Sequence, residues 1–196
     1  MELVRRAGAV IVEPRREWVR IKGEAAAPWR LFTAYAMILA AIPPGATFIR
    51  DVLIRPALYV RWHRWGLASA LGNAVLSYLS ALALVVVFAL ILTALAPGFS
   101  SSRDMGAALK LSVFSMTPGW LAGFFFLFPR AVWILVIVAA LYGVYIFYEG
   151  LEAGLLETPR DRVGGFLGVS FLAVLALFTI RWMVLSWIFA IRLHAF

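Results

Sequence analysis

Five long apolar runs, joined by short polar connections, account for most of the chain. Each run approaches or exceeds the length of about 20 residues that an α-helix needs to cross the hydrocarbon core of a bilayer. The pattern therefore predicts an all-α fold, a polytopic membrane helical bundle of about five transmembrane helices. The predicted spans cover residues 31–49, 67–95, 108–128, 131–148 and 166–191.

Proline and glycine interrupt two of these runs. The first run contains Pro43 and Pro44 followed by a glycine, and the third contains Pro118 followed by a glycine. Because proline lacks a backbone N–H and its ring clashes with the preceding turn, each interruption predicts a kink or a break. Two interrupted spans are one indication of a substrate site in transporters. They are equally typical of kinks in a packed bundle, where small residues let helices approach closely.

Residues 1–28 precede the predicted transmembrane domain, residues 29–196, and have a different pattern. Arginine and lysine are interspersed with apolar side chains, and Pro14 suits the start of a helix. The segment from there to Lys22 predicts a short helix with Trp18, Val19 and Ile21 on one side. Basic residues opposite a tryptophan are typical of an interfacial helix, so we expect a basic amphipathic segment on the cytoplasmic leaflet. A flexible tail with one ordered turn is the alternative.

Composition supports a lipid environment. Apolar residues make up 64% of the chain and charged residues 14%, whereas soluble domains have about 45–50% and about 25%. The net charge is +8, but the basic residues lie at span ends and in connections. That distribution is typical of topology signals and contacts to anionic lipid head groups, and it argues against nucleic acid as a ligand. Cysteine is absent, which excludes disulfides and thiolate chemistry.

The short connections carry unequal numbers of basic residues. If the amino terminus is inside, the inner segments hold more arginine and lysine than the outer ones, although the link after the first span reduces the difference. The positive-inside rule then predicts a cytoplasmic amino terminus and an outside carboxyl terminus. We expect a multi-pass protein of a cell membrane.

Catalytic motifs are missing from the sequence. It contains no zinc-protease, nucleophile-elbow, phosphate-loop or dinucleotide pattern. The two histidines, His63 and His194, are expected at separate interfacial positions, where a lone imidazole is usually solvated. We therefore predict a non-enzymatic protein without a metal or cofactor.

Two carboxylates follow the fourth span. Glu149 and Glu152 are three residues apart and share one face if the helix continues past Tyr148. Acidic groups beside a membrane are candidates for binding cations or carrying protons. The alternative is that they are solvated and paired with Arg160 or Arg162.

A single arginine, Arg181, lies near the middle of the fifth run. A guanidinium at that depth is unfavourable by about 2.5–3.5 kcal/mol on insertion scales unless it is paired or reaches water. Its partners are expected among the carbonyls freed at the proline breaks or a carboxylate such as Asp51. If the span instead ends near Arg181 and an interfacial helix follows, no partner is needed.

Five short stretches of the chain carry a pattern when they are taken in order. They are residues 14–22 (PRREWVRIK), 35–43 (YAMILAAIP), 96–99 (APGF), 107–120 (AALKLSVFSMTPGW) and 141–151 (LYGVYIFYEGL), the last followed by Thr158 and Pro159. Together they cover most of the chain and resemble the YIP family of Ypt/Rab-interacting proteins in its compact bacterial and archaeal form. The resemblance implies five spans in a prokaryotic cell membrane, a cytosolic amino terminus and an outside carboxyl terminus. Eukaryotic members are linked to Rab GTPases through a long cytosolic domain, but this chain lacks the family's Asp-Leu-Tyr-Gly-Pro stretch, so Rab binding is not expected.

Two functional hypotheses follow. The first is a non-enzymatic membrane protein that organises membrane or partner proteins through helix packing and its basic amino-terminal segment. The second is a small oligomeric transporter or channel with a site near the broken first and third spans. The expected partners are the lipid bilayer, anionic lipid head groups and an unidentified protein. A second copy of the chain, in a homo-oligomer, is a further alternative. The candidate functional residues are Pro43, Pro44, Pro118, Glu149, Glu152 and Arg181.

Overall fold

A computed structural model describes residues 2–24, 28–54, 67–128 and 132–194, and every regular element in these ranges is helical. His63 lies outside the described residues. The elements are α1 (Glu2–Val12), α2 (Pro14–Gly23), α3 (Pro28–Leu31), η1 (Phe32–Ala36), α4 (Met37–Leu39), α5 (Ile42–Ile49), η2 (Arg50–Ile54), α7 (Leu67–Leu95), η3 (Ala96–Phe99), α8 (Met105–Ala122), η4 (Gly123–Leu127), α9 (Val132–Glu152) and α10 (Arg160–His194).

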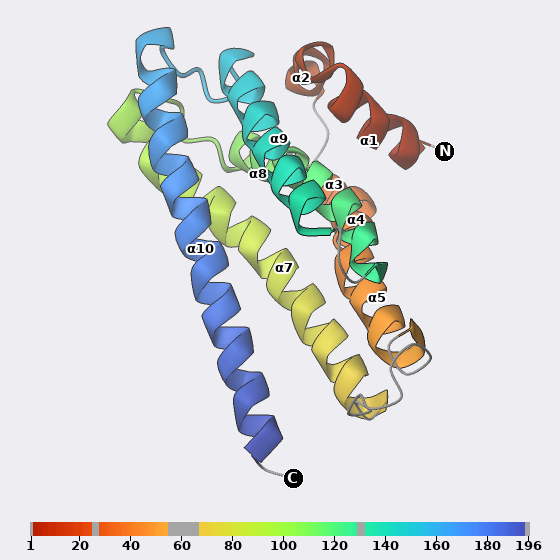
Figure 1. The fold of residues 1–196 in the computed structure, drawn as a ribbon. Helices are drawn as coiled ribbons and strands as arrows, with labels where there is room; N and C mark the ends of the chain where they lie inside the picture. Colours follow the sequence, from red (N-terminus) through yellow and green to blue (C-terminus); the bar gives the residue numbers. More distant parts are fainter. Residues whose placement is uncertain (1, 25–27, 55–66, 129–131, 195–196) are drawn as a thin grey trace.

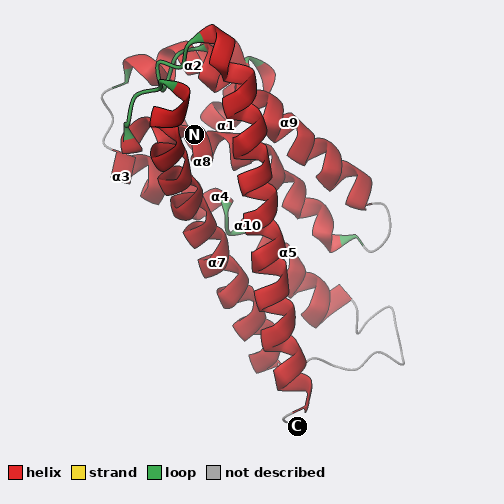
Figure 2. Cartoon of the chain, turned by 90° about the vertical axis from the view of Figure 1, so that its left-hand side faces the viewer, coloured by secondary structure: helices red, strands yellow, loops and turns green. Residues whose placement is uncertain are grey.

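The helices form an antiparallel bundle, which confirms the predicted fold class. In Figure 1, α3 to α5 run downwards, α7 returns, α8 and α9 form a second pair, and α10 runs down again. The amino-terminal helices α1 and α2 lie at the upper end, and the carboxyl terminus lies at the lower end. Figure 2 shows the same bundle from the side, with α7 and α10 extending below the α8–α9 turn.

Four segments in the described part of the chain are long and apolar enough to cross a membrane: Phe32–Ile54, Leu67–Phe99, Ile134–Glu152 and Arg160–Ile188. The remaining predicted span corresponds to α8 and η4. Helix α8 contacts α7 and α9 and also α1, α3, α4 and α5, so protein rather than lipid covers most of its surface. A helix in that position can carry polar side chains such as Lys110 and Ser112, which explains why its hydropathy is lower than that of its neighbours.

The two predicted interruptions differ in the structure. In the first span the helix breaks at Ala40 and Ala41, and Pro43 and Pro44 lie at the start of α5, where a missing N–H removes no helical hydrogen bond. Pro118 lies inside the continuous helix α8, so the third span is not broken there. Helix α8 instead tightens into the 3₁₀ turn η4 from Gly123 onwards.

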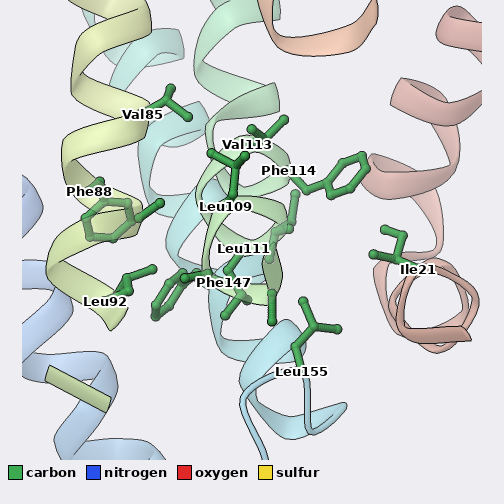
Figure 3. Packing of buried hydrophobic residues seen from close by; sticks show 14 of the residues in the cluster. Ile21, Val85, Phe88, Leu92, Leu109, Leu111, Val113, Phe114, Phe147 and Leu155 are labelled. Carbon is green, nitrogen blue, oxygen red and sulfur yellow. The ribbon is translucent and has the colours of Figure 1, made fainter. Parts of the chain in front are cut away.

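The core lies between α7, α8 and α9. Figure 3 shows Phe88 of α7 beside Phe147 of α9 on one side of α8. Phe114 of α8 points to the opposite side, where Ile21 of α2 lies. Small residues set the spacing: a Cβ at position 143 of α9 would lie 2.5 Å from the carbonyl oxygen of Ser115 on α8. Close packing of this kind is the main attraction between helices in lipid, because lipid tails are as apolar as the side chains.

The amino-terminal segment forms two helices, α1 and α2, rather than one. Trp18 and Ile21 are each 1% exposed because they face the bundle, whereas Val19 is 69% exposed on the opposite side. The prediction that these three side chains share one side of an interfacial helix is therefore wrong. Trp18 packs against protein and not against lipid. Its indole has a large apolar surface for this contact and an N–H that donates to a carbonyl of the bundle.

Candidate functional site

The amino-terminal hairpin, defined here as α1 and α2, is attached to the bundle by several polar contacts. The first is an ion pair. Glu149 of α9 is 4% exposed, and its two carboxylate oxygens accept hydrogen bonds from Arg15 Nε at 3.0 and 2.8 Å. The hydrogen bond to Glu149 and the attraction of its charge raise the pKa of Arg15 above its ordinary value. The partner of Glu149 is thus Arg15 of the hairpin, and not Arg160 or Arg162 as the alternative interpretation predicted.

The indole of Trp18 provides the second contact. Its Nε1 donates to the carbonyl oxygen of Ile146 at 2.9 Å, and its ring meets Phe114 edge-on, with centroids 5.7 Å apart. Position 150 of α9 has to be glycine for this arrangement, because a Cβ there would lie 2.9 Å from the indole ring and 2.5 Å from Leu111. The hairpin, α8 and α9 therefore meet at a single close-packed point.

A closed ring of four charges joins α1 to the end of α2. Arg6 lies 3.7 Å from Glu17 and also contacts Glu24, while Arg20 lies 4.0 Å from Glu17 and 3.4 Å from Glu24. The guanidinium of Arg6 also lies over the ring of Phe114 on α8, 5.2 Å from its centroid. Because two cations alternate with two carboxylates, each charge has an opposite neighbour on both sides. The ring fixes the angle between α1 and α2 and holds both against α8.

Donors from the bundle also satisfy carbonyls at the ends of both hairpin helices. Lys110 of α8 donates to the carbonyls of Ile21 and Glu24 at 3.1 and 2.9 Å, and Tyr142 of α9 donates to that of Ile11 at 2.6 Å. The carbonyls at a helix end lack intrahelical partners, and a cation there also interacts favourably with the helix dipole. This explains a lysine within the most buried helix of the bundle.

Beside this hairpin, a hollow of about 450 Å³ opens between the start of α2 and α9. It is lined by Val12, Glu13, Pro14, Arg15, Arg16 and Tyr145. Arg16 donates to Glu13 at 2.9 Å, and both of their side chains are largely exposed. The rest of the hollow is formed by the outer edge of Arg15 and the ring of Tyr145.

Arg181 finds its partners on α7. Its Nε donates to Ser80 Oγ at 2.9 Å, and its Nη2 donates to the carbonyl oxygen of Ser77 at 3.3 Å. The expected partners, the carbonyls near the proline breaks and Asp51, are not the ones used, and Asp51 is instead paired with Arg50. Helix α10 continues without a break to His194, so no separate helix follows Arg181.

The remaining candidate residues have separate surroundings. A Cβ at Gly123 would overlap the ring of Pro43, so the break in the first span packs directly on the start of η4. Pro44 and Pro118 are buried, whereas Glu152 is exposed at the end of α9. The structure thus gives Glu149, Arg181 and Pro43 different partners in different parts of the bundle.

Sequence reasoning missed helix α1 and the role of Lys110. One signal was available for α2 and the residue after it, because Arg20 and Glu24 are four residues apart and Glu17 and Arg20 three apart, spacings that favour ion pairs on a helix. For the role of Lys110 the signal was the residue itself, because a lysine inside the apolar run 108–128 needs a polar partner. Among the residues that the structure describes, no three histidine or acidic side chains are grouped so as to hold a metal ion.

The fold and the apolar helices define a helical integral membrane protein whose amino-terminal hairpin packs against the bundle. The family model described as the Yip1 domain matches residues 8–183, and the chain therefore belongs to the Yip1 domain family. The match begins within α1 and ends within α10, so it includes α2 and the last part of α1. Searches of curated proteins and of solved structures found no match to this chain.

Proposed function

We propose that the chain is a non-enzymatic membrane scaffold that organises membrane or partner proteins through the outward face of its hairpin. The proposal places the hairpin on the cytoplasmic side of a prokaryotic cell membrane and the carboxyl terminus outside. The opposite positions of the two termini in Figure 1 and the basic residues of the inner connections support this orientation.

One observation carries the proposal: the hairpin is held in a defined position while its other face stays uncovered. That outward face combines apolar and basic side chains, namely Val4, Arg5 and Val19. A surface already held in place loses less conformational entropy on binding than a flexible tail. Exposed apolar residues among cations suit a partner that offers both an apolar surface and negative charge.

Copurification tests the proposed role. The full-length protein, crosslinked in cells and purified, is compared with the variant Val4→Asp/Val19→Asp, which changes only side chains that point away from the bundle. A protein that the unmodified chain retains and this variant loses would support the scaffold. The same set of copurifying proteins with both chains would refute it. Ile180→Ser, on the exposed surface of α10, is the matched control for loss of an exposed apolar side chain.

The orientation has an independent test, because the chain has no cysteine. A single cysteine at Arg5 or added after Phe196 gives one labelling site at either end of the protein. We expect a membrane-impermeant maleimide to label only the carboxyl-terminal cysteine in intact cells and both cysteines after permeabilisation. Labelling of the Arg5→Cys protein in intact cells would reverse the orientation.

A further inference from the structure

We propose that the hollow between α2 and α9 binds one anionic phospholipid, with its phosphate on Arg15 and Arg16 and an acyl chain along the exposed face of α9. The inference uses the same docked hairpin as the proposed function but requires no protein partner. It follows from three features: the orientation of one guanidinium, the shape of the hollow, and the apolar strip below it.

Arg15 is held by one edge. Only its Nε is engaged, by both oxygens of the buried Glu149, and the side chain is 78% exposed. Within the described part of the chain, no acceptor takes up its terminal nitrogens. A buried carboxylate therefore orients the guanidinium and leaves its donors directed outwards. A planar guanidinium with free donors is well suited to bind a phosphate through two hydrogen bonds.

The hollow places a second cation and an aromatic ring beside those donors. Arg16 is on the next position of α2 and engages Glu13 through Nη1 alone. The two carboxylates of this region, Glu13 and Glu149, are thus both paired already, and an incoming phosphate would meet the unpaired donors of the two arginines. The hollow is shallow and open to the surface, and its volume of about 450 Å³ is enough for a phosphate head group. Tyr145 at its edge is typical of the boundary between head groups and acyl chains.

An apolar strip begins at the hollow and runs along α9. The exposed side chains of Tyr145, Leu141, Val138 and Ile134 recur at helical spacing on one face. At 1.5 Å per residue, the strip is about 16 Å long, which matches one leaflet of a hydrocarbon core about 30 Å thick. A free phosphate would use only the hollow, whereas a phospholipid would also cover the strip. The continuity of the two surfaces favours the lipid.

Native mass spectrometry of the purified full-length protein tests this site. The protein is titrated with dioleoyl phosphatidylglycerol and, separately, with dioleoyl phosphatidylcholine. The Arg16→Gln variant removes one phosphate donor without exposing the buried Glu149. Because a hydrogen bond to a charged group contributes enough to change an equilibrium about tenfold, we expect Arg16→Gln to weaken phosphatidylglycerol binding about tenfold. Arg103→Gln, which neutralises an exposed arginine before α8, is the matched control and should leave binding unchanged.

A second variant tests Arg15, the arginine that Glu149 holds in position. Arg15→Gln/Glu149→Gln removes the cation and its buried partner together, so that the carboxylate at position 149 is not left buried without a cation. It should lose phosphatidylglycerol binding while retaining its helix content by circular dichroism. Equal affinity for the two lipids, or equal effects of Arg16→Gln and Arg103→Gln, would overturn the proposal.

Competition experiments distinguish the lipid from other anions. Millimolar inorganic phosphate and an acidic peptide such as polyglutamate should leave the bound phosphatidylglycerol in place, because neither covers the strip on α9. Displacement by phosphate would identify a site for free anions, and displacement by the peptide would identify a protein-binding surface. Either result contradicts the proposal. Loss of lipid binding would leave the copurification experiment unaffected, so the two proposals fail separately.

Discussion

Removal of the Trp18 side chain should release the hairpin from the bundle. The indole is 1% exposed, donates one hydrogen bond to α9 and contacts Phe114 of α8. Truncation of a buried tryptophan to alanine typically destabilises a structure by about 3–5 kcal/mol, which includes the lost packing and the cavity left behind. Because about 1.4 kcal/mol corresponds to a tenfold change, Trp18→Ala should raise the population of the undocked hairpin at least about 100-fold.

The undocked state can be measured through a single cysteine. Ala7 of α1 is buried in the docked hairpin, and Ala7→Cys adds one sulfur atom to a chain that has no other thiol. When opening is fast and reversible, the maleimide labelling rate of this cysteine follows the undocked population. We expect Trp18→Ala to accelerate labelling at least about 100-fold. Trp18→Phe, which keeps most of the ring but loses a hydrogen bond of about 1 kcal/mol, should accelerate it about fivefold.

The control for this experiment is Val19→Ala, since Val19 is the neighbouring residue on the uncovered face. It should change the labelling rate less than twofold, as expected for a surface substitution. Circular dichroism separates local undocking from global unfolding, because only the latter removes most of the helical signal. A labelling rate for Trp18→Ala within twofold of the unmodified hairpin would show that the indole does not hold the hairpin on the bundle.

Three further substitutions test other contacts. Glu149→Gln keeps the shape of the side chain but removes its charge, and it should accelerate labelling of the Ala7→Cys reporter less than Trp18→Ala does; a larger effect would make the ion pair the principal attachment. Gly123→Ala would force a Cβ into the ring of Pro43 and should destabilise the bundle by about 1–3 kcal/mol, which lowers the Tm in detergent by at least about 2 °C. Its control is Gly119→Ala, which should leave the Tm unchanged because the space around its Cβ is open. Ser80→Ala removes a hydrogen-bond acceptor from the guanidinium of α10 and should lower the Tm by about 2–4 °C, and an unchanged Tm would show that water or lipid takes over this contact.

Hydrophobic runs were sufficient to predict the spans because a bilayer imposes the same two requirements on every lipid-facing helix. Most of its side chains must be apolar over about 20 residues, and each backbone group must bond within the helix. Both conditions are visible locally, in runs such as 67–95 and 166–191. The helix whose surroundings are protein, α8, shows the limit of this reasoning. Its composition is suited to the side chains that pack around it. Those side chains belong to other helices, several of which are distant in the sequence, so a local pattern does not reveal them.

The candidate residues illustrate the same division. Glu149 and Arg181 stood out in the sequence because a charge in an apolar region requires compensation, and the structure gives partners to both. The partners themselves lie 134 and 101 residues away, in Arg15 and Ser80. No local pattern relates residues at such separations. The side on which Trp18 lies was also undetermined, since an amphipathic helix buries its apolar face equally well in lipid or against protein.

What the sequence determined by itself was the membrane environment, the all-helical class, the position of the first break and the need to compensate two isolated charges. These properties depend on the free energy of placing individual side chains and peptide groups in lipid, which is a sum over neighbouring residues. Only the tertiary structure decided that the amino-terminal hairpin docks, that Lys110 and Tyr142 hold its carbonyls, and that a hollow forms beside Arg15. Those properties depend on the close packing of three distant segments, for which glycine at 150 leaves the necessary space.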